Sequence, residues 1–339
     1  MSASRTDPSM PDPGPPRKLR WAGLWAPFLI AGLLVAGWSA GWVYAARQVE
    51  AGLERGVADL RASGTKVAWS SKRLSGYPFR LNLALSNLRV AGGGWVVEAP
   101  DLEAQAFLHA PRNWLVATPS GLVVTRPDGG GLEVRGRRIL ASFALAAEGM
   151  PRVSIEGLGL TFRPAPGARP FALAGAERLE LHLRPGPDDK AAVFLRLEGG
   201  APEPGRLLAD LGGGAPVSGQ LEAIADRASM LGQPTPLRAW SAAGGRLELR
   251  QAGLTTGETR LSVASPGLGA SPDGQLTGPL TLRTSGPPEV LRVLLKHGVI
   301  SPGEAAGGLA AAVLGRQSAD DTRIDVELSA GRARWVRPR

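Results

Sequence analysis

The stretch Arg80-Leu81-Asn82-Leu83-Ala84-Leu85-Ser86 places a leucine at every second position, and Phe79 extends this series in front of Leu81. Side chains of a β-strand point alternately to its two faces, so this spacing predicts a strand with one buried and one wet face. Asn82 and Ser86 stand on the wet face. We therefore expect a half-buried strand in which Phe79 shares the buried face with the leucines.

The same alternation recurs along most of the chain. Further examples are Leu102/Ala104/Ala106/Leu108, Ile139/Ala141/Phe143/Leu145, Leu179/Leu181/Leu183, Val193/Leu195/Leu197 and Leu247/Leu249. Turn-forming stretches at 127–131, 185–189 and 271–275 separate them, and 46 glycines with 29 prolines favour many short elements over long helices. This pattern predicts a mainly β fold, with antiparallel meander sheet(s) in an open or half-closed β-rich domain.

A few short helices interrupt the alternation. We expect a short helix near 204–212, a turn or helix near 236–245, and two helices at 287–301 and 302–315, followed by final strands at 323–329 and 332–338. The β-rich domain then covers 64–336, with two halves of about 64–200 and 216–336 as one possible division. One elongated domain and two stacked sheets both fit this pattern.

Residues 21–46 carry no charge and predict a transmembrane helix, since about 20 apolar residues cross a bilayer. Aromatic residues mark both of its ends, as is typical of side chains at the two membrane–water interfaces. These predicted interface anchors are Trp21, Trp25, Trp38, Trp42 and Tyr44.

The flanks of this segment predict its orientation. Arg17, Lys18 and Arg20 precede it, and clustered positive charge tends to stay cytoplasmic. We therefore expect a disordered cytoplasmic tail at 1–20, one span at 21–46 in a bacterial inner membrane, and a periplasmic main domain. A polar juxtamembrane helix at 47–63, with Val49, Leu53, Val57 and Leu60 at helical spacing, favours an uncleaved anchor over a cleaved signal peptide.

The chain carries little that predicts catalysis. It has no cysteine, which excludes disulfides and thiolate chemistry, and its three histidines (His109, His182 and His297) are far apart. The acid pairs Asp188-Asp189 and Asp320-Asp321 stand in turn-like stretches, where solvated carboxylates are usual. We expect no enzyme activity and no catalytic, cofactor-binding or metal-binding residue.

Gly37-Trp38-Ser39-Ala40-Gly41 matches the G-x-S-x-G pattern of serine hydrolases. That elbow must follow a strand and open a helix, whereas this copy lies inside the predicted span with no His or Asp beside it. Its glycines also form a Gly-x-x-x-Gly pattern, which leaves pairing of two membrane helices open.

The net charge of +9 comes mainly from arginines scattered singly along the predicted strands. Nucleic-acid surfaces need clustered positive charge, so we expect no nucleic-acid partner.

The stretch Leu74-Ser75-Gly76-Tyr77-Pro78-Phe79-Arg80-Leu81, preceded by Trp69-Ser70-Ser71, resembles the signature of the domain of unknown function 2125 family. The resemblance covers about residues 20–336 and implies a membrane-anchored envelope protein of Gram-negative bacteria without an assigned activity. The glycine-bounded strands near 244–284 are similar to the C-terminal regions of AsmA-like proteins, which implies a distant link to phospholipid movement.

Two interpretations of Tyr77 and Phe79 remain open. They either begin the first long strand as an aromatic plug, or they line the mouth of an apolar groove as ligand-binding residues. For the whole protein we expect a non-enzymatic role, with a phospholipid or other hydrophobic ligand bound by the apolar sheet face. The alternative is a structural scaffold that pairs with envelope proteins.

Overall fold

The computed structural model describes residues 21–145, 149–232, 236–271, 275–314, 322–329 and 332–336. The tail 1–20, with Arg17, Lys18 and Arg20, lies outside these residues, and so does Asp320-Asp321. The helices are α1 (Trp21–Ala62), α2 (Leu207–Gly212), the 3-10 helix η1 (Ala228–Gly232), α3 (Pro236–Ala242), α4 (Pro287–Lys296) and α5 (Pro302–Leu314).

The first nine strands are β1 (Lys66–Ala68), β2 (Ser71–Ser75), β3 (Arg80–Gly92), β4 (Trp95–Phe107), β5 (Ala110–Ala117), β6 (Leu122–Arg126), β7 (Gly130–Arg135), β8 (Arg138–Ala144) and β9 (Arg152–Pro164). The others are β10 (Leu173–Pro185), β11 (Ala191–Pro202), β12 (Val217–Ala225), β13 (Leu247–Thr256), β14 (Thr259–Ala270), β15 (Leu276–Thr284), β16 (Thr322–Ser329) and β17 (Arg332–Val336). In the described part of the chain these seventeen strands form one sheet.

The sheet is an antiparallel meander in which three of the long strands each pair with two shorter strands. β1 and β2 both pair with β3, β5 and β6 both pair with β4, and β7 and β8 both pair with β9. From β9 to β17 each strand pairs with the next in sequence. The predicted meander is confirmed, and the two halves considered from the sequence are continuous through β11 and β12.

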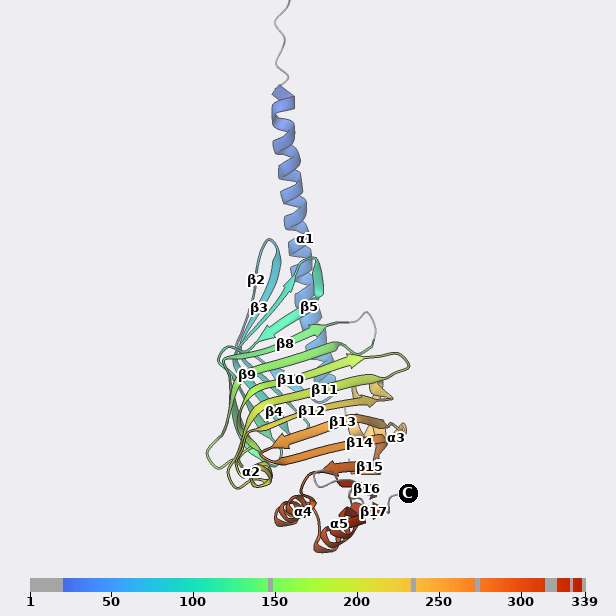
Figure 1. Ribbon diagram of the computed structural model, residues 1–339. Coiled ribbons are helices and arrows are strands. Elements are labelled where there is room, and N and C mark those ends of the chain that lie inside the picture. Colours follow the sequence, from blue (N-terminus) through green and yellow to red (C-terminus); the bar gives the residue numbers. More distant parts are fainter. Residues whose placement is uncertain are drawn as a thin grey trace, which may run out of the picture.

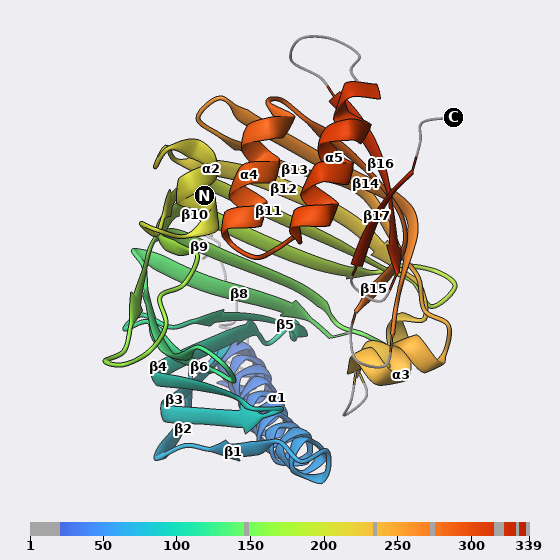
Figure 2. The ribbon, with the colours of Figure 1, turned by 90° about the horizontal axis from the view of Figure 1, so that it is seen from below.

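The sheet is strongly curled, so β1–β4 and β11–β16 lie on opposite sides of the molecule (Figure 2). α1 is a single helix whose N-terminal part extends away from the sheet (Figure 1). It is the one helix in the described residues that is long and apolar enough to cross a membrane. The predicted polar helix at 47–63 is thus the second half of the same helix.

One apolar face runs along the meander. The strand register aligns Leu181 of β10 with Ile155 of β9 and with Leu195 of β11, and Leu195 in turn with Leu221 of β12. The same row continues through Ala252, Val263, Leu282 and Ile324. Because side chains in register share a face, these residues form a continuous apolar strip.

Helices cover this face at its margins. Leu53 of α1 packs against the cluster of Leu83, Leu85 and Ala104. At the other end, Ala311 and Ala312 of α5 pack against Ile324 and Val326. Leu208 of α2 contacts a third cluster, formed by Leu132, Leu160, Phe162, Leu173 and Ala176. Each of these three clusters thus lies under one helix.

One carboxylate joins α2 to α4. Asp210 of α2 accepts hydrogen bonds from Lys296 Nζ and His297 Nε2, at the C-terminal end of α4, both at 2.6 Å. These two donors hold the pKa of Asp210 below its ordinary value. Because the pKa of this carboxyl is lower in the folded than in the unfolded state, the ionised form of Asp210 stabilises the fold at neutral pH. This stabilisation is lost as the pH falls through the folded-state pKa.

We therefore expect the Asp210→Asn variant to unfold at a lower temperature than the wild type at pH 7. This difference should shrink as the pH is lowered into the range where Asp210 takes up a proton. Thermal unfolding followed by circular dichroism checks the prediction, with Asp59→Asn on exposed α1 surface as the control. A difference that is constant with pH would contradict it.

Candidate functional site

The turn between β2 and β3 binds the middle of α1 through three hydrogen bonds. Trp38 Nε1 donates to the carbonyl of Pro78, and Trp42 Nε1 donates to the carbonyl of Arg80, each at 2.8 Å. The hydroxyls of Ser39 and Tyr77 are also 2.8 Å apart, and Ser39 donates to the carbonyl of Val35, so Tyr77 is the donor to Ser39. We call these contacts the junction.

Aromatic rings add to the junction. The rings of Trp42 and Tyr77 meet edge-on with centroids 5.8 Å apart, and those of Trp38 and Phe79 are 6.0 Å apart. Tyr77 and Phe79 nevertheless remain 53% and 65% exposed. The expectation that Phe79 lies on the buried face of the strand is wrong, because β3 begins at Arg80 and Phe79 belongs to the turn before it. The face begins with Leu81, which is fully buried.

Gly76 gives this turn its shape. Its φ of +105° lies in a region that favours glycine, and a Cβ on this residue would stand 2.7 Å from the carbonyl oxygen of Arg80. The backbone N–H of Arg80 closes the turn on the carbonyl of Gly76 at 2.9 Å. The Ser-Gly-Tyr-Pro-Phe-Arg stretch is therefore a tight turn that presents its carbonyls and aromatic rings to α1.

Beyond the junction, α1 follows the sheet to its far end. Ala46 and Val57 are buried, and Lys72 of β2 lies 3.6 Å from Glu50 and 3.8 Å from Glu54. α1 thus runs beside β3 from Arg80 toward Gly92. The turn at 76–79 consequently lies at the end of the sheet that faces the apolar N-terminal half of α1.

A hollow of about 400 Å³ lies next to this turn. Side chains from β3, β4, β5 and β8 line it, with Phe107, Trp114, Leu115 and Phe143 as its large apolar residues. Arg80 and Arg152 also line it, and the Arg80 guanidinium carbon is 5.4 Å from the ring centroid of Phe107. An apolar lining beside two guanidinium groups suits an amphiphile with an anionic head.

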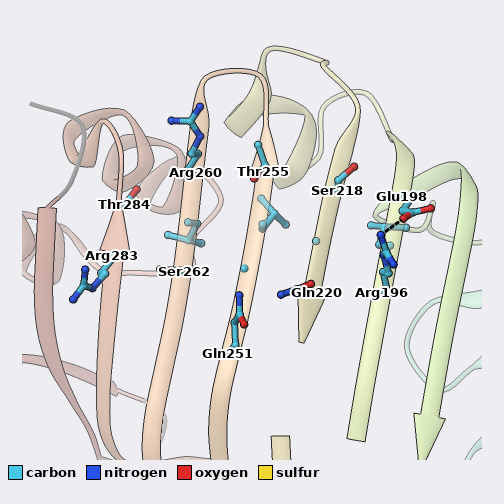
Figure 3. A pocket seen from close by; sticks show the side chains of 15 residues that line it. Arg196, Glu198, Ser218, Gln220, Gln251, Thr255, Arg260, Ser262, Arg283 and Thr284 are labelled. Carbon is cyan, nitrogen blue, oxygen red and sulfur yellow. Dashed lines mark ion pairs between the residues drawn. The ribbon is translucent and has the colours of Figure 1, made fainter. Parts of the chain in front are cut away.

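A second hollow, of about 660 Å³, lies over β11–β15 and is polar (Figure 3). Arg196, Gln220, Gln251 and Arg260 are among its lining residues, and Arg196 is paired with Glu198 at 2.6 Å. It faces away from α4 and α5, on the opposite side of the sheet from the apolar strip. No acid, base and nucleophile converge there among the described side chains, so we assign it no chemistry.

The junction unites four of the residues singled out from the sequence, namely Trp38, Trp42, Tyr77 and Phe79. Trp25 and Tyr44 are exposed at 55% and 66%, and the side chain of Trp21 lies outside the described residues. Sequence reasoning missed Ser39, which it discarded with the hydrolase-like pattern. Ser39 precedes Trp42 by three residues and therefore lies on the same face of the helix, which is the sequence signal that indicates Ser39.

Within the described residues, no group of three or more His, Asp or Glu side chains is placed to hold a metal ion. Asp189, from the predicted acid pair, instead accepts hydrogen bonds from the backbone N–H and the hydroxyl of Ser229, which lower its pKa. This carboxylate joins the β10–β11 turn to η1.

A curled meander sheet joined to a long apolar helix defines the class of this molecule: a helix-linked, mainly β protein. The model of the family "Uncharacterized protein conserved in bacteria (DUF2125)" matches residues 42–334, and the chain belongs to this family. No curated protein and no solved structure matches it. The match begins at Trp42, inside α1, so the family unit includes the helical segment that packs on the sheet.

Proposed function

We propose that this bacterial protein is anchored by α1 in the inner membrane, with its sheet on the periplasmic side, and that the apolar face binds the acyl chains of a lipid. An uncleaved anchor is supported by the junction, which holds α1 on the 76–79 turn, and by Leu53 of α1, which packs on Leu83 and Leu85. The positive flank at Arg17, Lys18 and Arg20 supports the orientation.

The observation that carries lipid binding is the uncovered middle of the apolar strip. Ile155 is 37% exposed, and its register partners Leu181, Leu195 and Leu221 are only half-buried. A sheet face of this kind is normally buried against helices, a second sheet or a ligand. Acyl chains satisfy that requirement, and the strip continues to Val153 and Phe143 near the turns beside α1.

Mass spectrometry of the purified full-length protein tests the proposal. We expect phospholipid to remain bound, in near-stoichiometric amount, after extraction in a mild detergent and washing with a second one. The control is another single-span protein prepared identically, since any membrane protein carries some annular lipid. A lipid-free preparation that contains a stoichiometric envelope protein would overturn lipid binding and favour the scaffold alternative.

A further inference from the structure

The ends of three successive strand pairs carry exposed apolar side chains on the side of the sheet that faces the apolar half of α1. The register places Arg80 opposite Phe107, Asn113 opposite Ala144, and Ala144 opposite Arg152. The turns at 76–79 and 108–109, Leu145 and the first residue of β9 therefore lie along one rim. We call it the proximal rim.

The exposed residues of this rim are Tyr77, Phe79, Phe107 and Leu145, which are 53%, 65%, 49% and 49% exposed. His109 stacks on Phe107 with ring centroids 5.3 Å apart. Arg80, Arg112 and Arg152 stand exposed among them. The next turn on the same rim, at 186–190, is Gly-Pro-Asp-Asp-Lys and carries no large apolar residue.

The position of α1 fixes the level of the 76–79 turn of this rim. A hydrocarbon core about 30 Å thick takes roughly 20 helical residues, and the uncharged segment starts at Trp21. Trp38 and Trp42 therefore fall where the helix leaves the hydrocarbon, and their hydrogen bonds hold the 76–79 turn at that level. Phenyl and phenol rings with guanidinium groups are the side chains that membrane interfaces favour.

We propose that the proximal rim rests on the bilayer that α1 spans, with its aromatic rings in the interface and Arg80, Arg112 and Arg152 on the phosphates of anionic lipids. This inference rests on the anchor in the proposed function. The contact places the 400 Å³ hollow, on one face of the sheet, and the Phe143–Val153 end of the apolar strip, on the other face, against the lipid headgroups. A lipid chain then passes from the bilayer to the sheet without crossing water.

Because the chain has no cysteine, single introduced cysteines report on this contact. Spin labels at Phe107→Cys and Leu145→Cys, on the full chain in phosphatidylglycerol nanodiscs, should be more accessible to oxygen than to a water-soluble nickel chelate. The matched control is Trp95→Cys, which is 50% exposed at the opposite end of β4. Its label should show the reverse preference.

A label at Leu33→Cys, in the apolar half of α1, separates the two proposals. If the Leu33 label lies in lipid while those at 107 and 145 behave like that at 95, the rim contact is wrong and the anchor stands. If the Leu33 label also lies in water, the anchor fails and the rim contact fails with it.

Changing the headgroup charge of the lipid tests separately whether the arginines bind lipid phosphate. Labels at 107 and 145 should be less accessible to the nickel chelate in phosphatidylglycerol than in phosphatidylcholine nanodiscs. The double variant Arg112→Gln/Arg152→Gln should remove most of that difference. Each basic residue near an anionic surface contributes up to roughly tenfold to the affinity for that surface, and the variant removes two of the three arginines. Equal accessibility in the two lipids would overturn the assignment of the arginines to lipid phosphate.

Discussion

Leu81→Ala is expected to lower the free energy of unfolding of the sheet by about 2–5 kcal/mol, which is the range for a fully buried leucine. Leu81 is the most buried large side chain of β3, at 0% exposure. It stands next to the junction, where α1, β3 and β4 meet, and its register partner Ala106 is also buried. Removing its methyl groups leaves a cavity that neither the small Ala106 nor the hydrogen-bonded turn is placed to fill.

Phe79→Ala is the matched control for this substitution. Phe79 lies two residues away and is the larger side chain, but it is 65% exposed, and its ring packs against that of Trp38. We expect its loss to change stability by about 0.5 kcal/mol or less. Thermal unfolding of both variants in one detergent, followed by circular dichroism, compares them. An equal loss for both would mean that Phe79 acts as the aromatic plug considered from the sequence.

The strands were predictable because the signal for them is local. Alternation from Leu81 to Leu85 depends only on the geometry of one strand, and from β9 to β17 each neighbour in the sheet follows next in sequence. The helices at 287–301 and 302–315 were predictable for the same reason, as α4 and α5 show. The start of β3 was misplaced by one residue, because the turn closed by Gly76 and Arg80 continues the alternating pattern into a segment that is not a strand.

The junction was not predictable, because it depends on contacts between residues about 40 positions apart. Aromatic residues near the end of an apolar segment indicate interface anchors, and nothing local shows that Trp38 and Trp42 donate to the carbonyls of Pro78 and Arg80. Similarly, the alternation shows that a face is apolar, whereas the lengths and positions of α1, α2 and α5 decide which parts of it are covered.

Placing a negative charge in the uncovered strip is expected to abolish lipid binding. Leu181 and Leu195 are register partners on β10 and β11, both are half-buried, and neither belongs to the clusters under α1, α2 and α5. A charge in hydrocarbon costs about 2.5–3.5 kcal/mol, and 1.4 kcal/mol corresponds to tenfold in affinity. Leu195→Glu should therefore reduce bound phospholipid roughly 100-fold. Gln220→Glu, at the edge of the polar hollow on the opposite face, should leave it unchanged.

In Leu195→Glu the charge is present while the chain folds, so a loss of lipid would also follow if the sheet failed to form. Leu195→Cys avoids this problem, because the side chain remains small and uncharged until a thiol-reactive sulfonate is added to the folded protein. We expect lipid to be released on modification, with the circular dichroism spectrum unchanged and with no release from modified Gln220→Cys. If modified Leu195→Cys keeps its lipid, the strip is not where acyl chains bind. The bound lipid would then belong to the surface of α1, and the half-buried leucines of β10 and β11 would need a protein partner instead.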